Sequence, residues 1–283
     1  MMRLMMALLL SGLMLTRIAG ACPIADVPAP EETAMATLLE SPRHGEWVDV
    51  AMGEGEAPVR TWVVYPERAG LAPVVIVIHE IFGLTDWIRA VADALAAEGY
   101  VAVAPDLLSG KGPGGGGTGA FTGDAVREAV QGLNDDEIGR RLEAVRTYAY
   151  KLPATSMKSA VIGFCWGGTA TFTYVSKQAG LDAAVVFYGT GPGDVATAKA
   201  VKSPVLGLYG GDDARVTATV PTTQQVMEEA GRPFEANVYD GAGHGFLRQQ
   251  NGCEGANAEA AALAWARTLV FLQAYLNDAA AKK

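Results

Sequence analysis

Cysteine is scarce in this sequence: 283 residues contain three, and no two of them have the C-x-x-C spacing. So small a number argues against a disulfide-stapled scaffold, and the missing C-x-x-C pair argues against a redox thiol protein. Long apolar runs are also scarce, because after the first twenty residues none reaches the length of a membrane-spanning helix. Half of the residues are nevertheless apolar, and the length is typical of one α/β domain with a sizeable core.

Basic clusters and complete cofactor motifs are missing as well. The 22 Lys and Arg residues are outnumbered by 31 Asp and Glu, a balance that argues against a nucleic-acid partner. Gly110-Lys111 lacks the Ser or Thr that completes a P-loop, and Gly189, Gly191 and Gly193 lack the G-x-G-x-x-G spacing. His79-Glu80 is not followed by the second histidine of the H-E-x-x-H zinc motif. We therefore expect no cofactor and no metal.

The first 21 residues have the layout of a secretory signal peptide. Arg3 precedes an apolar run over 4–15 that is too short to span a bilayer, and Ala19-Gly20-Ala21 provides a cleavage site. Cleavage there would remove two arginines and change the formal charge from −9 to −11. We expect a secreted or periplasmic protein. Because the residues before Cys22 loosely resemble a lipobox, a lipid anchor on Cys22 is one alternative, and a cytosolic protein with an apolar leader is another.

After this segment we expect a lead-in over 22–46, a single domain over 47–276 and a polar tail over 277–283. The Pro- and Ala-rich stretch Pro23–Pro30 predicts a surface linker. In the domain, strand and helix patterns alternate, which predicts a mostly parallel sheet with helices on both faces. The expected strands are Trp47–Met52, Val59–Tyr65, Pro73–Ile78, Tyr100–Ala104, Ala160–Phe164, Asp182–Tyr188, Pro204–Tyr209 and Phe234–Tyr239, and the expected helices are Asp86–Glu98, Ala125–Leu133, Asp135–Lys151, Trp166–Gln178, Thr219–Ala230 and Ala256–Tyr275.

The stretch Ser109–Gly123 is rich in glycine, and such a segment cannot hold one conformation cheaply. It is either a mobile lid over a site or a slack connection, and the sequence favours neither interpretation.

Cys165 follows an apolar strand and precedes a helical pattern. A nucleophile at such a strand-to-helix turn needs very small residues two positions to either side, and Gly163 and Gly167 occupy these positions. The pattern is G-x-C-x-G-G, the nucleophile elbow G-x-S-x-G with sulfur in place of oxygen. The alternative is a glycine-flanked cysteine buried in the core.

Titratable residues follow four of the expected strands. The carboxyl ends of parallel strands meet at one edge of a sheet, where such sheets place their chemistry, so this convergence predicts an active site. The residues are His79 and Glu80 after 73–78, Cys165 after 160–164, Asp212 and Asp213 after 204–209, and His244 after 234–239.

The order Cys165, Asp213, His244 is the nucleophile, acid, histidine order of α/β-hydrolases. A histidine can take the proton of a thiol, and an acid on its other nitrogen fixes the tautomer and supports the imidazolium. Asp212 is the rival acid, but we prefer Asp213 because its spacing places Val216 to pack behind the loop.

The remaining roles concern the substrate carbonyl and the glutamate. We expect the backbone N–H groups of Ile81 and Trp166 to stabilise the oxyanion that forms on the carbonyl. Glu80 either is a strand-end charge in solvent or contacts the thiol and helps to fix its ionisation.

These residues resemble the dienelactone hydrolase family, the carboxymethylenebutenolidases, which have the α/β-hydrolase fold. The similarity spans about 47–275 and is carried by the motifs H-E-I-F-G at 79–83, G-F-C-W-G-G at 163–168, and G-D-D-A-R-V with G-H-G-F-L-R at 211–216 and 243–248. The resemblance implies the same roles for the residues named above. It adds Arg248, four residues after the histidine, as the arginine that binds the substrate carboxylate, and Phe82 as a substrate contact.

Two departures from the family pattern concern the substrate. The family has a second carboxylate-binding arginine after a P-D-L segment, but here Pro105-Asp106-Leu107 is followed by the glycine-rich stretch with only Lys111 nearby. The archetypal enzymes are cytosolic and lack an export signal. We expect a hydrolase that cleaves a small-molecule ester or enol-lactone, with or without a carboxylate, and we expect Cys165 to be reduced. The alternatives are a broad carboxylesterase or thioesterase and a non-catalytic binder.

Overall fold

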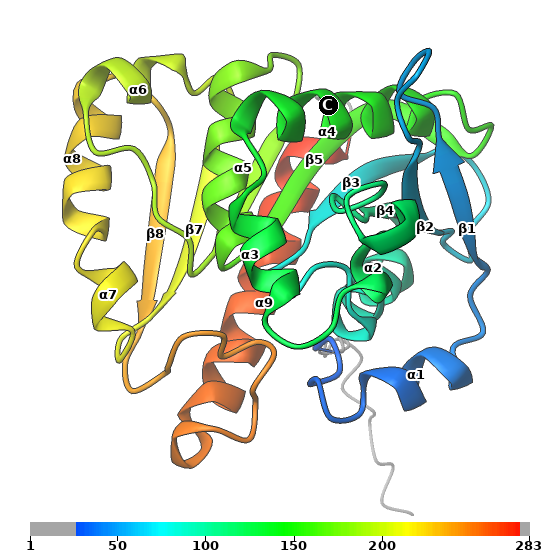
Figure 1. Cartoon of the computed structure of the whole chain (residues 1–283). Helices are drawn as coiled ribbons and strands as arrows, with labels where there is room; N and C mark the ends of the chain where they lie inside the picture. Colours follow the sequence, from blue (N-terminus) through cyan, green and yellow to red (C-terminus); the bar gives the residue numbers. More distant parts are fainter. Residues whose placement is uncertain (1–26, 278–283) are drawn as a thin grey trace, which may run out of the picture.

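The computed structural model describes residues 27–277, in which eight strands form one sheet covered by helices (Figure 1). The expected signal peptide over 1–21, Cys22 and all but the first residue of the expected polar tail lie outside the described residues. The strand order is β1-β2-β4-β3-β5-β6-β7-β8. β1 pairs antiparallel with β2, and β2 with β4, whereas all other pairs are parallel. The strands are β1 (Gly45–Val50), β2 (Val59–Val64), β3 (Ala72–Ile78), β4 (Val101–Pro105), β5 (Thr155–Phe164), β6 (Ala183–Phe187), β7 (Val205–Gly210) and β8 (Phe234–Tyr239).

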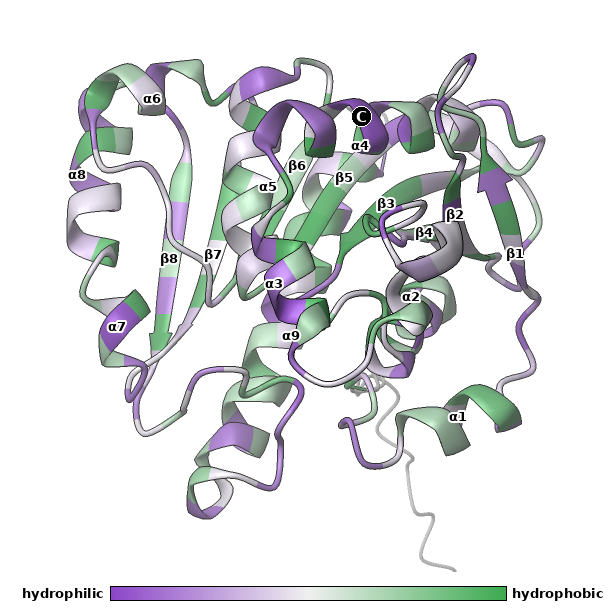
Figure 2. Ribbon diagram, in the orientation of Figure 1, coloured by the Kyte–Doolittle hydropathy of each residue, from purple (hydrophilic) through white to green (hydrophobic). Residues whose placement is uncertain are grey.

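The central strands are apolar on both faces because both faces are covered. Every residue of β3 and β4 is buried. Alternate side chains enter opposite cores: Val75 and Val77 belong to one cluster, and Val74 and Ile76 to the other. Figure 2 shows β3 and β5 in the colour of hydrophobic residues, with hydrophilic residues on the overlying α4. This double burial makes the sheet a rigid frame for the loops at its carboxyl edge.

Helices cover the two faces in two groups. α1, α2 and α9 contribute to one core cluster, and α4, α5, α6 and α8 contribute to the other. Figure 1 shows α4 and α5 in front of the sheet and α9 behind it. The helices are α1 (Ala34–Glu40), α2 (Asp86–Ala97), α3 (Ala125–Gln131), α4 (Asp135–Ala149), α5 (Trp166–Lys177), α6 (Val195–Ala200), α7 (Ala214–Thr217), α8 (Val220–Glu229) and α9 (Ala256–Leu276), with short 3₁₀ turns at Pro113–Gly115, Thr118–Ala120 and Cys253–Gly255.

The expected parallel sheet with helices on both faces is confirmed. All eight expected strands and six expected helices are present, and the largest difference is β5, which begins at Thr155 rather than Ala160. Three helices were not expected: α1, α6 and α7. Each is at most seven residues long, too short to display a full periodic pattern in the sequence. Among residues 27–277, no helix combines the length and apolarity needed to cross a bilayer.

The described part of the lead-in packs against the domain rather than forming the expected surface linker. Val27 contacts a core cluster and Pro28 is buried. The Gln250 side chain donates a hydrogen bond to the Pro28 carbonyl at 2.7 Å, and the Glu31 N–H donates to the Arg248 carbonyl at 3.0 Å. These contacts hold the start of the described chain beside the loop that follows β8.

The glycine-rich stretch 109–123 is anchored by Asp106, which is buried at the end of β4. The N–H and the hydroxyl of Thr118 both donate to its carboxylate at 2.7 Å. The approach requires glycine at position 117, because a Cβ there would lie 2.1 Å from Asp106 Oδ2. The Thr118 hydroxyl in turn accepts from the Leu84 N–H at 3.0 Å. The stretch is therefore fastened to the segment that follows β3.

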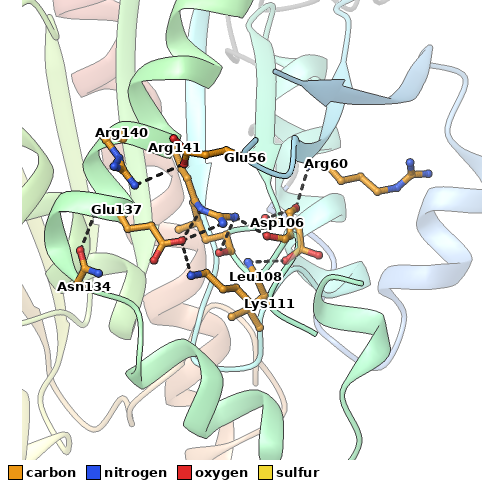
Figure 3. Close-up of polar contacts among 11 residues, drawn as sticks. Glu56, Arg60, Asp106, Leu108, Lys111, Asn134, Glu137, Arg140 and Arg141 are labelled. Atoms are coloured by element: carbon orange, nitrogen blue, oxygen red, sulfur yellow. Dashed lines mark hydrogen bonds and ion pairs between the residues drawn. The ribbon is translucent and has the colours of Figure 1, made fainter. Parts of the chain in front are cut away.

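A second set of contacts fastens the first residues of this stretch to α4 (Figure 3). Lys111 Nζ lies 2.8 Å from Glu137 Oε1, and the Arg141 guanidinium lies 3.0 Å from the same oxygen. Arg141 also donates to the Ser109 carbonyl at 2.8 Å. With anchors at both 109–111 and 118, the stretch is not a slack connection, and that interpretation of the sequence is wrong.

Candidate active site

Cys165 lies at a strained turn between β5 and α5. Its φ is 54° and its ψ is −115°, a conformation that is costly for a residue with a side chain. The neighbouring backbone is packed too closely for larger residues: a Cβ on Gly163 would lie 2.1 Å from the Gly167 carbonyl oxygen, and a Cβ on Gly167 would lie 2.3 Å from that of His79. The turn leaves Cys165 half-buried at the edge of a cavity, so it is not a core cysteine.

The structure brings together three side chains that are far apart in the sequence. His244 Nε2 lies 3.1 Å from Cys165 Sγ, and His244 Nδ1 lies 2.5 Å from Asp213 Oδ2. The buried carboxylate can hold Nδ1 protonated, which leaves Nε2 free to accept the proton of the thiol. This geometry is the one that nucleophilic catalysis by a thiol requires.

Asp213 rather than Asp212 contacts the histidine. Asp213 is buried, whereas Asp212 is exposed. The other carboxylate oxygen of Asp213 accepts from the Val216 N–H at 3.4 Å, at the start of α7. Val216 is buried, as expected for a residue that packs behind this loop, and its N–H helps to hold the Asp213 carboxylate in place.

A cavity of about 310 Å³ opens beside the thiol. Ile81 and Trp166, whose N–H groups we expect to stabilise an oxyanion, line it together with Cys165. Arg248 and Phe82 do not line this cavity. Its remaining lining residues are Gln131, Thr169, Tyr188, Thr190, Arg215 and Val216.

Glu80 is buried and paired with Arg248, so it is not a strand-end charge in solvent. Glu80 Oε2 lies 2.8 Å from Arg248 Nε, and the same guanidinium pairs with Glu31 of the lead-in. The Phe82 ring lies 5.0 Å from the Arg248 guanidinium carbon. Burial raises the pKa of Glu80 to about 7, although the charge of Arg248 opposes this shift.

The surroundings of the sulfur favour the neutral thiol. Burial raises the pKa of Cys165, and the charge of Glu80 adds to the effect. The Trp166 N–H acts in the opposite direction, because it can donate to the thiolate. Formation of a thiolate therefore needs a base, and His244 is in contact with the sulfur. Cys165 and Cys253 are both free thiols in the structure.

Tyr188, for which the sequence pattern predicts no role, lies beside the histidine. It follows β6 with φ 41°, its ring centroid lies 5.1 Å from that of His244, and its hydroxyl is buried with no hydrogen-bond partner in the described chain. Its position at the end of an expected strand was the available signal. His79, by contrast, is fully buried and contacts the Glu80 carbonyl at 2.7 Å. Its ring stacks on Trp166, so His79 packs against a residue that lines the cavity without lining the cavity itself.

No group of three or more His, Cys, Asp or Glu side chains within 27–277 could hold a metal ion. The sheet order, the turn at Cys165 and the contacts of His244 define an α/β-hydrolase with its polar cluster at the carboxyl edge of the sheet. Within that class the chain belongs to the dienelactone hydrolase family, because the model of this family matches residues 59–276. The chain is thus a hydrolase, and the resemblance seen in the sequence is confirmed.

Curated relatives agree with this assignment. A protein of Methylorubrum extorquens named "Putative carboxymethylenebutenolidase" is 32% identical over 244 residues, which cover 82% of this chain and 81% of the relative. A protein of the same name from Escherichia coli K12 is 33% identical over 240 residues, covering 80% of this chain and 84% of the relative.

Solved structures show the same fold. The structure titled "Putative Dienelactone Hydrolase" from Klebsiella pneumoniae has a TM-score of 0.73 and 30% identity, covering 82% of this chain and 99% of that one. A dienelactone hydrolase-like promiscuous phosphotriesterase, P91, from metagenomic libraries has a TM-score of 0.71 at 24% identity, covering 83% and 99%, and shows the likeness of fold alone.

Proposed function

We propose that this hydrolase cleaves an ester or an enol-lactone by nucleophilic catalysis through an acyl-thioester on Cys165. The observation that carries the proposal is the chain of contacts from sulfur to imidazole to carboxylate, at 3.1 Å and 2.5 Å. Membership of the dienelactone hydrolase family supports the reaction class.

In the first half of the reaction, Cys165 Sγ attacks the carbonyl carbon while its proton passes to His244 Nε2. Asp213 stabilises the imidazolium that forms. The carbonyl oxygen becomes an oxyanion beside the N–H groups of Ile81 and Trp166. The bond from the carbonyl carbon to the leaving oxygen then breaks, and this oxygen takes the proton from His244. The acyl group remains on sulfur.

In the second half, water takes the place of the leaving group. His244 removes a proton from the water, whose oxygen attacks the thioester carbonyl, and the C–S bond breaks. The proton returns to Cys165 Sγ, so the resting thiol is restored. The negative charge of Glu80 disfavours the thiolate, and we propose that it keeps Cys165 protonated between turnovers.

The test is substitution of the nucleophile. Cys165→Ala should abolish hydrolysis of p-nitrophenyl acetate while leaving the circular dichroism spectrum and the melting temperature unchanged. In the unsubstituted protein, rapid-quench mass spectrometry should find an acetyl group on the peptide that contains Cys165. Retained turnover in the alanine variant would remove the mechanism.

Two other functions are separated by further measurements. A broad carboxylesterase or thioesterase would hydrolyse simple neutral esters and thioesters as fast as enol-lactones in a substrate panel. A non-catalytic binder would react with iodoacetamide at Cys165 without turning over any member of the panel.

We also propose that the chain is exported and cleaved after Ala21, on the pattern of its first 21 residues. Intact-mass measurement of the protein from its native host should then give a chain beginning at Cys22. An added diacylglycerol mass would identify a lipoprotein instead, and a full-length mass would exclude cleavage.

A further inference from the structure

We propose that the cavity beside Cys165 continues into a second cavity along α5 that holds the acyl chain of the substrate, so that the site prefers esters of an unbranched, uncharged chain of several carbons. This inference rests on the proposed function and adds a substrate class to it. The feature that carries it is a cavity of about 250 Å³ that adjoins the one beside the thiol.

The first observation is that one helix lines both cavities. α5 begins directly after Cys165, and its residues Trp166 and Thr169 line the cavity beside the thiol. Thr169 also lines the second cavity, together with Thr173 and Ser176. These positions are three or four residues apart, so they follow one face of the helix. A chain bonded to Sγ can therefore run along this face from the first cavity into the second.

Two further segments line the cavities in the same succession. After β6, Thr190 borders both cavities and Pro192 borders the second. Gln131, the last residue of α3, borders the first cavity, and Asp135, the first residue of α4, borders the second. At the junction, the Thr190 N–H donates to Thr169 Oγ1 at 3.0 Å, and the two hydroxyl oxygens are also 3.0 Å apart. Three segments thus run past both cavities, and the threonine pair marks where they meet.

The lining of the second cavity fits an apolar chain. Phe172 and Val201, two buried members of a core cluster, are among its lining residues. The hydroxyls that border it are already used as donors: that of Ser176 donates to the Thr173 carbonyl at 2.8 Å, and that of Thr197 donates to a carboxylate at 2.7 Å. These donors need no partner from a ligand, whereas methylene groups that leave water for the apolar lining gain free energy.

The charges of the second cavity lie at the end of α5 and are compensated. Lys177 and Asp135 border the cavity, and Lys177 Nζ lies 3.7 Å from Asp135 Oδ2 and 2.8 Å from Asp136 Oδ1. No other charged residue of the described chain lines this cavity. Because one cation already faces two carboxylates, this end of the cavity does not attract an anion. The far end of the acyl chain is therefore expected to be uncharged.

The positions of the reacting groups assign the chain to the acyl half of the substrate. The acyl group stays on Cys165 Sγ, at the start of α5. The leaving oxygen must lie beside His244 Nε2, which gives it a proton, and His244 lines neither cavity. The alcohol therefore departs on the side of His244, and the acyl chain is the part of the substrate that can follow α5.

Alkylation of Cys165 tests the second cavity without requiring turnover. Iodoacetamide and N-hexyl-iodoacetamide carry the same reacting group and differ by an unbranched chain. In the unsubstituted protein, the ratio of the hexyl rate to the iodoacetamide rate should be about tenfold higher at Cys165 than at the exposed Cys253, as expected when about two methylene groups are buried. Peptide-resolved mass spectrometry measures both thiols in one sample. Equal ratios at the two thiols would overturn the inference.

Filling the second cavity locates the effect. Thr173→Trp should lower the hexyl-to-iodoacetamide ratio at Cys165 about tenfold, to the value found at Cys253. Ser176→Phe fills the same cavity from the next turn of α5 and should act in the same direction if the first variant does not fold. Thr147→Trp is the matched control, because Thr147 is exposed on α4 and lines neither cavity, and it should leave the ratio unchanged. A ratio that neither filling variant lowers, or that the control lowers equally, would contradict the inference.

Turnover gives a second, independent reading. Thr173→Trp should lower the ratio of kcat/KM for p-nitrophenyl octanoate to that for p-nitrophenyl acetate about tenfold. Ethyl acetate and octyl acetate differ in the alcohol half, and their ratio should stay the same; a fall in this ratio instead would assign the second cavity to the alcohol and overturn the inference. If the unsubstituted protein hydrolyses no ester at all, the proposed function fails, while the alkylation ratio still decides whether a chain on Cys165 enters the second cavity.

Discussion

The imidazole Nε2 of His244 lies 3.1 Å from the Sγ of Cys165, although 79 positions separate the two residues in the chain. The parallel sheet produces this contact, because β5 and β8 both end at its carboxyl edge, with β6 and β7 between them. Asp213 follows β7 and lies on the far side of the imidazole. Each of the three residues therefore depends on a different strand for its position.

Asp213→Asn should lower kcat by about 10³- to 10⁴-fold, because an amide stabilises the wrong imidazole tautomer and cannot support the imidazolium. The fold should survive, since an asparagine oxygen can still accept from the Val216 N–H at the start of α7. Steady-state kinetics on p-nitrophenyl acetate measure the effect. The exposed neighbour supplies the control: Asp212→Asn should keep kcat within a factor of about two. Similar losses in both variants would contradict the assignment of the acid.

Glu80 should make stability depend on pH. Its pKa is about 7 in the folded protein and 4.5 in an unperturbed chain, so the folded state binds this proton more tightly. The free energy of unfolding should therefore have its full contribution below pH 4.5 and lose it as the pH rises through 7. The whole difference is on the order of 3 kcal/mol.

Urea unfolding at pH 5 and pH 8 measures this dependence in the unsubstituted protein and in Glu80→Gln. The pKa values that the charge of Glu80 affects, those of Cys165, Tyr188 and Arg248, are raised from ordinary values of 9.0 or more, so the change in the stability difference between pH 5 and pH 8 isolates the glutamate. The variant should lose less stability between the two pH values. Parallel pH dependences would show that burial of Glu80 does not shift its proton affinity.

Asp106→Asn should loosen the glycine-rich stretch. The amide nitrogen of asparagine cannot accept the hydrogen bonds that one carboxylate oxygen receives, so a Thr118 donor would lose its partner. The cost of such a loss is about 1–3 kcal/mol. Trypsin should then cut after Lys111 faster than in the unsubstituted protein. The exposed Asp124→Asn is the matched control, and equal cleavage rates in the two variants would contradict the anchoring role.

The sequence alone was sufficient to predict the central strands of the sheet and the turn at Cys165. Continuous apolar runs such as 73–78 and 160–164 favour central strands, and the glycines on either side of Cys165 favour a turn with close backbone contact; the structure shows both. The short helices α1 and α7 could not be predicted from the sequence, because helices of seven and four residues are too short to show a periodic pattern. Packing against the rest of the fold decides whether such short helices form.

What the sequence determined by itself is therefore the succession of the strands and of the longer helices along the chain, the turn at Cys165 and the edge of the sheet at which titratable groups collect. Only the tertiary structure decided how the charges pair. Glu31 and Arg248 meet across 217 positions, so Arg248 is compensated while Arg215 remains without a partner in the described chain. The physical reason is that periodicity and backbone sterics act between near neighbours along the chain, whereas a charge responds to whatever the closed fold brings within a few ångströms.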